Sequence, residues 1–102
     1  MELRTQHSIP KQKMMENKNS EILNNIVDRY TEEEILIADG FNKAIIGIDQ
    51  NTTRIIYSYT KLIQILMEDD MTREEAIEYF QYNIQSAYVG EKTPIYCMDD
   101  FE

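Results

Sequence analysis

The spacing of apolar residues changes twice along this chain, and that change constrains the fold more than any other feature of the sequence. Apolar residues recur at helical spacing over residues 22–30, then form two short β-rich runs at residues 43–49 and 54–58. Helical spacing returns over residues 59–67 and 77–88. Spacings of three and four residues place side chains on one face of a helix, whereas short Ile- and Tyr-rich runs favour strands. The pattern predicts an α+β fold.

The pattern Thr-x-x-Glu, which is typical of a helix start, occurs at residues 31–34 and again at residues 72–75. In such a capping box the hydroxyl and the carboxylate bond the free amides of each other's residues. The first box predicts a helix that ends at Gly40, because glycine readily takes the left-handed conformation that closes a helix. The second box predicts a long helix that reaches about Tyr88.

The β-rich runs predict a small sheet. Residues 43–49 and 54–58 are separated by four polar residues, which favours a hairpin, and Gly47 inside the first run indicates a bulge. Residues 93–98 form a third β-rich run, and Pro94 favours the start or the edge of a sheet. The expected order is helix, helix, strand, strand, helix, helix, strand. We therefore expect a three-stranded, mainly antiparallel sheet with helices packed on one face.

Charge is distributed unevenly along the 102 residues, whose formal net charge is −9. Residues 1–18 are polar, carry a net charge of +2 and show no apolar period, so we expect a mobile N-terminal arm. Residues 19–102 are expected to form a single domain. Its last third, residues 68–102, holds ten acidic residues against only Arg73 and Lys92, a net charge of −8.

The composition argues against several classes of function. The excess of acidic residues argues against direct binding of nucleic acid, which depends on Lys and Arg at the phosphates. The single cysteine excludes an internal disulfide, and without a signal peptide we expect the chain in the cytoplasm. No apolar run approaches the roughly 20 residues that span a membrane, so no membrane association is expected.

The sequence also lacks the patterns of catalytic and metal sites. It has no glycine-rich phosphate loop, no paired Cys or His at metal spacing and no nucleophile elbow. His7 falls in the expected arm, and Cys97 is interpreted as a small buried hydrophobic residue. The cluster Glu68-Asp69-Asp70 lacks the alternating ligands and central glycine of a calcium loop. We expect no enzyme activity, no metal and no cofactor.

The most distinctive surface predicted from the sequence is acidic. On the helix from residue 73, helical spacing puts Glu74 and Glu78 on one outward face, flanked by two tyrosines. We call this surface and the preceding turn the acidic ridge: Glu68, Asp69, Asp70, Glu74, Glu75, Glu78, Tyr79 and Tyr82. Aromatic side chains are enriched in protein interfaces, and carboxylates attract basic partners, so the ridge is a candidate partner-binding site. The alternative is an ordinary solvated helix face that favours solubility.

Several short motifs between residues 31 and 98 carry a resemblance to a known family. They are Asp39-Gly40-Phe41 with Ala44-Ile45-Ile46-Gly47, Met71-Thr72-Arg73-Glu74-Glu75-Ala76, and Ala87-Tyr88-Val89-Gly90-Glu91-x-Thr93-Pro94. In these motifs the chain resembles a family of short uncharacterised phage and prophage proteins. It departs from the family pattern at Ser58 and Thr60, where aspartates are expected. The resemblance implies phage origin and an anti-defence role of the anti-CRISPR kind, and it supplies no catalytic residues.

Two functional hypotheses follow. The first is a phage-encoded inhibitor, in the cytoplasm of the bacterial host, of a defence or nucleic-acid-handling protein with a basic nucleic-acid-binding surface. A CRISPR effector is the leading target class, because its guide–target channel is positively charged. The alternative is a small self-associating structural or accessory module, a homodimer joined at the Pro94 strand or through its N-terminal helices. The inhibitor needs an exposed acidic face, and the module needs an uncharged apolar patch.

Overall fold

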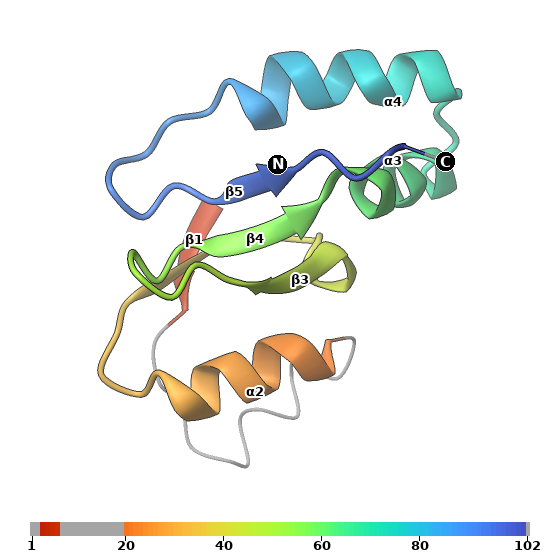
Figure 1. The fold of residues 1–102 in the computed structure, drawn as a ribbon. Helices are drawn as coiled ribbons and strands as arrows, with labels where there is room; N and C mark the ends of the chain where they lie inside the picture. The colour runs from red at the N-terminus through yellow and green to blue at the C-terminus, as the bar shows by residue number, and fades with distance from the viewer. Residues whose placement is uncertain (1–2, 7–19, 102) are drawn as a thin grey trace.

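A three-stranded sheet forms one layer of the protein in the computed structural model, which describes residues 3–6 and 20–101 (Figure 1). Its strands are β3 (Ile45–Ile48), β4 (Ile55–Ser58) and β5 (Ile95–Cys97), in that spatial order. β3 pairs antiparallel with β4, whereas β5 pairs parallel with it. A parallel neighbour needs a long crossover connection, and the two helices between β4 and β5 provide it. The sheet is therefore mixed.

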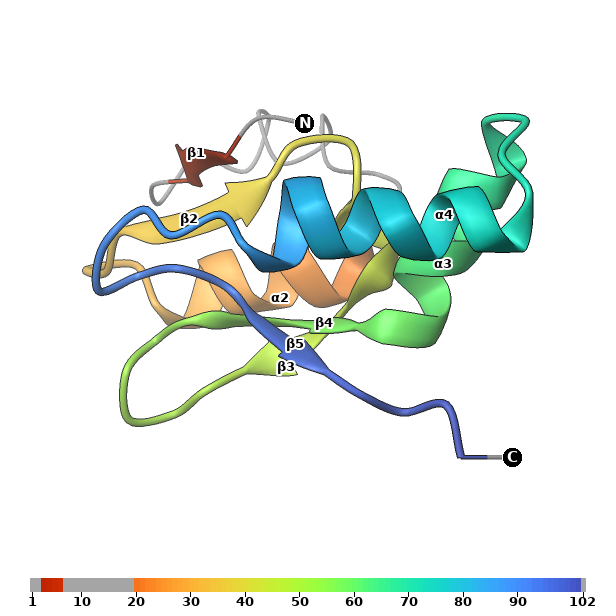
Figure 2. The same cartoon turned by 90° about the horizontal axis from the view of Figure 1, so that it is seen from above.

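Helices form the second layer and lie on one face of this sheet, as Figure 2 shows from above. They are α2 (Glu21–Arg29), α3 (Tyr59–Glu68) and α4 (Arg73–Tyr79), which continues into the π-helical segment η3 (Phe80–Gln85). Strand β2 (Ile35–Ala38) lies on the same side of the sheet and pairs antiparallel with β1 (Leu3–Gln6). The predicted α+β class is confirmed, as is the three-stranded sheet with helices on one face.

The core fills the space between the sheet and the helices. Tyr57 on β4 is fully buried, and its hydroxyl oxygen accepts a hydrogen bond of 2.7 Å from the Ala38 N–H of β2. Phe80 is 3 % exposed and makes edge contacts with Tyr59 and Tyr96, at ring-centroid distances of 5.1 and 5.5 Å. Aromatic pairs favour this edge geometry. Phe80 thereby connects the acidic helix to the sheet.

Several predictions that depend on residues close together in the chain are confirmed. Ser20 caps α2 by accepting from the Leu23 N–H, and Ser58 caps α3 by accepting from the Lys61 N–H. The register of β3 and β4 shifts between Ile45 and Gly47, which is the predicted bulge. β5 lies at an edge of the sheet, as expected for a strand that follows a proline.

The helix predicted for residues 31–40 is wrong. Residues 31–33 form a turn, and Ile35–Ala38 is strand β2, in which three of four side chains are buried. Two isoleucines with a leucine between them suit a strand, and pairing with β1 supplies the backbone partners that strand needs. The capping pattern at Thr31 is overridden by this distant pairing.

The end of the long helix and two side-chain placements also differ from expectation. The helical backbone ends at Gln85 and not near Tyr88, whose side chain is 77 % exposed. The chain then turns at Gly90, whose carbonyl accepts a hydrogen bond of 2.6 Å from the Thr93 hydroxyl. Cys97 is half-buried and not a buried core residue, because none of the described helices covers the outer face of β5.

The expected arm lies mostly outside the described residues, and so does His7. Its described part, residues 3–6, forms β1. No strand had been expected there, because this short segment is polar apart from Leu3.

Candidate functional site

The acidic ridge follows the chain from the end of α3 through α4. Glu68 is the last residue of α3, Asp69 and Asp70 form the turn, and the remaining members lie on α4 and at the start of η3. All six carboxylates are exposed; Tyr82 is 73 % exposed, and Tyr79 is half-buried. The structure thus places the predicted residues along one continuous stretch of surface.

The start of α4 holds part of the ridge in a defined geometry. The Thr72 hydroxyl oxygen accepts from the Glu75 N–H at 3.1 Å, and Glu75 Oε1 accepts from the Thr72 N–H at 2.9 Å. This is the predicted capping box. Asp70, just before it, has a φ of 67°, a left-handed conformation that aspartate tolerates better than most residues. Glu74 and Glu75 lie in the first turn, where negative charge is favourable.

One side of the ridge is hollowed. A shallow cavity of about 320 Å³ is lined by Met71, Glu75, Glu78, Tyr79, Tyr82 and Asn83. Residues 75, 78, 79, 82 and 83 share a face because they are spaced three and four apart. The sequence therefore contained the signal for the lining, although not for the hollow itself. We call this cavity the tyrosine–glutamate hollow.

Arg73, which lies within the ridge segment, is paired with an acid outside the ridge. Its Nη2 atom is 3.0 Å from Asp100 Oδ2. Both side chains are about half exposed, so the pair contributes little to stability. Its effect on the ridge is electrostatic. Arg73 is the only cation of α4, and its charge pairs with Asp100 in the C-terminal segment.

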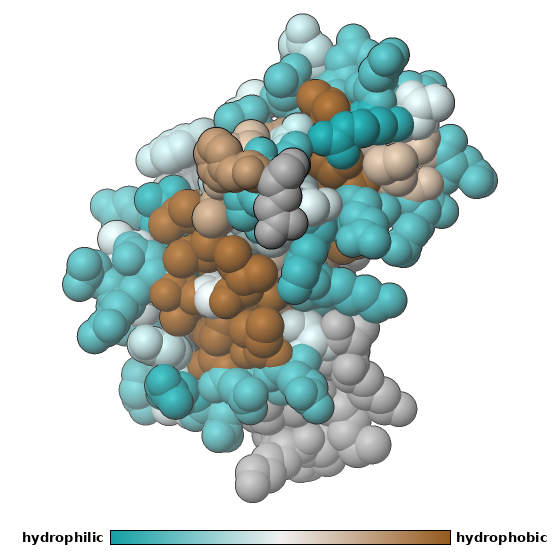
Figure 3. Space-filling view, turned by 45° about the vertical axis from the view of Figure 1, so that its right-hand side comes forward, coloured by the Kyte–Doolittle hydropathy of each residue, from teal (hydrophilic) through white to brown (hydrophobic). Residues whose placement is uncertain are grey.

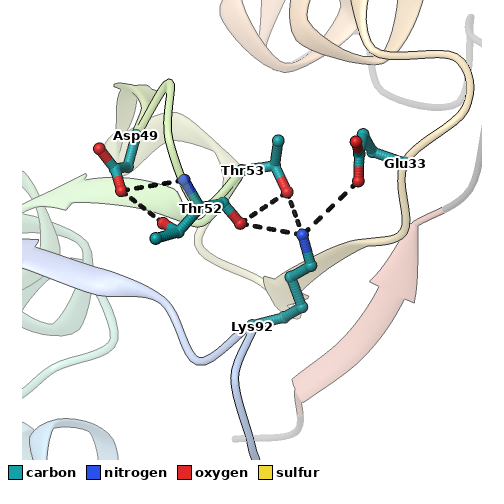
Figure 4. Close-up of polar contacts among 5 residues, drawn as sticks. All are labelled: Glu33, Asp49, Thr52, Thr53 and Lys92. Atoms are coloured by element: carbon teal, nitrogen blue, oxygen red, sulfur yellow. Dashed lines mark hydrogen bonds and ion pairs between the residues drawn. The ribbon is translucent and has the colours of Figure 1, made fainter.

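Lys92, the second cation of the acidic third, is also held elsewhere (Figure 4). Its ammonium group lies 3.6 Å from Glu33 Oε2 and donates to the Thr52 carbonyl at 2.9 Å and to the Thr53 hydroxyl. Asp49 accepts from the N–H and the hydroxyl of Thr52, and the hydroxyl bond lowers the pKa of Asp49. Lys92 thus links the β3–β4 loop to Glu33, which precedes β2.

Asp99 holds the C-terminal segment against the start of α3, and sequence reasoning missed it. It accepts from the Ser58 hydroxyl at 2.5 Å, the Thr60 N–H at 2.9 Å and the Thr60 hydroxyl at 2.7 Å. These hydrogen bonds, that of Ser58 first, lower the pKa of Asp99 to about 2. Asp99 lies about 40 positions after Ser58 and Thr60 in the chain, so no local pattern indicates the contact.

A second surface, the outer face of the three-stranded sheet, is apolar. Ile56 pairs with Ile95, and both are half-buried, whereas Ile55 and Tyr57 point inward and are fully buried. Ile46, on β3, is 39 % exposed. Figure 3 shows apolar side chains gathered in one patch at the level of the sheet.

Among residues 3–6 and 20–101, no group of three or more His, Cys, Asp or Glu side chains is arranged to hold a metal ion. No helix in the same part of the chain combines the length and apolar character needed to cross a membrane. No family model, curated protein or solved structure matches the chain. Its function must therefore be inferred from its own surfaces.

Proposed function

We propose that this protein is a phage-encoded inhibitor of a host defence or nucleic-acid-handling protein, active in the cytoplasm of the bacterial host. In this proposal the acidic ridge occupies a basic groove where DNA or RNA phosphates otherwise lie. A CRISPR effector is the leading target class, because its guide–target channel is positively charged. The observation that supports the proposal is the row of six exposed carboxylates, within which the one interspersed cation, Arg73, pairs with Asp100 outside the row.

The proposed mechanism is steric and electrostatic and needs no chemical step. A run of carboxylates on a surface presents closely spaced negative charges, as a nucleic-acid backbone does. Opposite charges steer the two proteins together at low salt, and short-range contacts then hold the complex. Tyr79 and Tyr82 supply those contacts, since aromatic side chains are enriched among the residues that dominate binding energy.

A charge-reversal variant tests the proposal. Lysine replaces four exposed acids of the ridge: Glu68→Lys, Asp69→Lys, Glu74→Lys and Glu78→Lys. Asp70 is left in place because its positive φ disfavours lysine, and Glu75 because it caps α4. A control of equal net charge reverses four exposed acids elsewhere: Glu21→Lys, Asp28→Lys, Glu32→Lys and Glu34→Lys.

Each variant is immobilised and exposed to host lysate, and retained proteins are identified by mass spectrometry. We expect a nucleic-acid-binding protein to be retained by the parent and by the control, to be lost with the ridge variant, and to be displaced by added nucleic acid. Its association should slow as salt rises from 0.05 to 0.5 M, since the Debye length falls from roughly 14 to 4 Å. Retention by the ridge variant equal to that by the parent would refute the proposal.

The apolar outer face of the sheet favours a second candidate function, that of a self-associating accessory module. Monomeric proteins seldom expose a large continuous apolar patch, and such patches often mark interfaces. Here the patch spans β3, β4 and β5 and includes the strand after Pro94. Analytical ultracentrifugation of the parent distinguishes the two candidates. A dimer that salt strengthens, because salt screens repulsion between two chains of net charge −9, would favour the module.

A further inference from the structure

The tyrosine–glutamate hollow combines two kinds of side chain that together recognise a cation. Its lining residues include two glutamates, Glu75 and Glu78, and two tyrosines, Tyr79 and Tyr82. A carboxylate alone attracts any cation, whereas an aromatic face adds attraction for a cation that lies over the ring. A lining of this composition suits a cation that has a planar face.

We propose that the hollow binds the guanidinium group of an arginine side chain presented by a basic partner. This inference rests on the proposed function and specifies the partner chemistry at one point of the acidic ridge. Guanidinium is planar, stacks on aromatic rings and pairs with carboxylates through two parallel N–H donors. The ammonium group of lysine is a compact, strongly hydrated charge that stacks less well. The hollow, at about 320 Å³, has room for one such side chain.

The backbone beneath the hollow orients these groups before any partner arrives. Glu75 is held through Oε1 in the capping box, which leaves Oε2 for a ligand. Phe80 and Ile84, on the opposite side of the helix, are 3 % and 0 % exposed and anchor the segment in the core. Tyr79 and Tyr82 flank the change from α-helix to π-helix, and such changes in helix type occur frequently at functional sites.

A model peptide tests the inference without knowledge of the partner. The probe is glycine–arginine–glycine, blocked at both ends, titrated into the isotope-labelled protein at low salt and followed by NMR. The matched control replaces arginine by citrulline, which has nearly the same shape and no charge. We expect saturable chemical-shift changes confined to residues 71–83 and a dissociation constant on the order of 10 mM for the arginine peptide. The citrulline peptide should bind at least about fivefold more weakly.

Variants separate the two kinds of contact. Glu78→Gln removes charge, Glu75→Gln removes charge but keeps a capping side chain, and Tyr82→Leu removes the ring but keeps apolar area. Each variant should weaken binding of the arginine peptide about threefold. Tyr82→Phe keeps the ring, so it should weaken binding of the peptide less than Tyr82→Leu does. Glu32→Gln removes an exposed charge elsewhere and should bind the peptide as the parent does.

Two results would overturn the inference: equal shifts with the citrulline peptide, or shifts spread over the whole acidic surface without saturation. Its failure is separable from that of the proposed function. If the peptide does not bind in the hollow while the ridge variant still fails to retain the host protein, the arginine-binding inference is wrong and the inhibitor proposal stands. If the peptide binds while the ridge variant still retains the host protein, arginine binding by the hollow is supported and the inhibitor proposal is refuted.

Discussion

The acidic ridge and the outer face of the sheet are two exposed surfaces of one small protein, and they depend on opposite forces. The ridge carries six carboxylates, whose electrostatic attraction extends over a distance set by the salt concentration. The sheet face carries Ile46, Ile56 and Ile95, and apolar side chains attract a partner only when the surfaces touch. The helices lie on the inner face of the sheet, so the outer face keeps its apolar side chains at the surface. A chain of 102 residues thus exposes both a charged and an apolar surface.

The largest effect is expected at Phe80, which lies between the two surfaces. Its ring contacts Tyr59 and Tyr96, so Phe80→Ala removes the packing that joins the α4–η3 helix to the sheet. The free energy of unfolding should fall by about 3–5 kcal/mol, measured by urea denaturation. A loss below about 1 kcal/mol would mean that the ridge and the sheet do not share one core.

A smaller loss is expected at Tyr57, the inward neighbour of Ile56 on β4. Tyr57→Phe keeps the ring but leaves the Ala38 N–H of β2 without its acceptor. A buried N–H that loses its hydrogen bond costs about 1–3 kcal/mol, and urea denaturation measures this. Unchanged stability would show that another acceptor replaces the hydroxyl.

Acid should weaken the attachment of the C-terminal segment that borders both surfaces. Because the pKa of Asp99 is lowered to about 2 in the folded protein, its stabilisation is present above its unfolded pKa near 4. It is lost as pH falls from about 4 to 2. Asp99 is largely exposed, so the contribution is below about 1 kcal/mol.

Comparison of the parent with Asp99→Asn measures this contribution. The asparagine variant should be less stable at pH 6, and the difference should shrink towards pH 2. Asp28→Asn, which alters an exposed acid on α2, is the control. A stability difference that stays constant with pH would rule out the carboxylate as the cause.

A small effect on stability is also expected on the outer face of the sheet. Ile56→Thr with Ile95→Thr keeps β-branched side chains on β4 and β5 while it reduces the exposed apolar area. We expect a change in stability within about 1 kcal/mol and no change in binding through the ridge. If the parent forms a dimer in ultracentrifugation and this double variant does not, the sheet face is the dimer interface.

Elements that depend on near neighbours in the chain were predictable. The residues that start α2, α3 and α4 bond backbone groups three positions away, and the β3–β4 hairpin joins adjacent runs. The exposure of Glu74 and Glu78 follows from helical spacing, and so does the lining of the hollow by residues of α4 and η3. The outer face was not predictable, since the sequence cannot tell which side of a sheet the helices will cover.

The sequence by itself determined the α+β class, the starts of α2, α3 and α4, the bulge at Gly47 and the acidic character of α4, because these depend mainly on residues close together in the chain. Only the tertiary structure decided that residues 35–38 form a strand, since their partner is the distant β1. It also decided that β5 runs parallel to β4, and that Ser58 and Thr60 bind Asp99. These contacts join segments some 30 to 40 residues apart, and their free energy exceeds the weak local preferences that a sequence pattern reports.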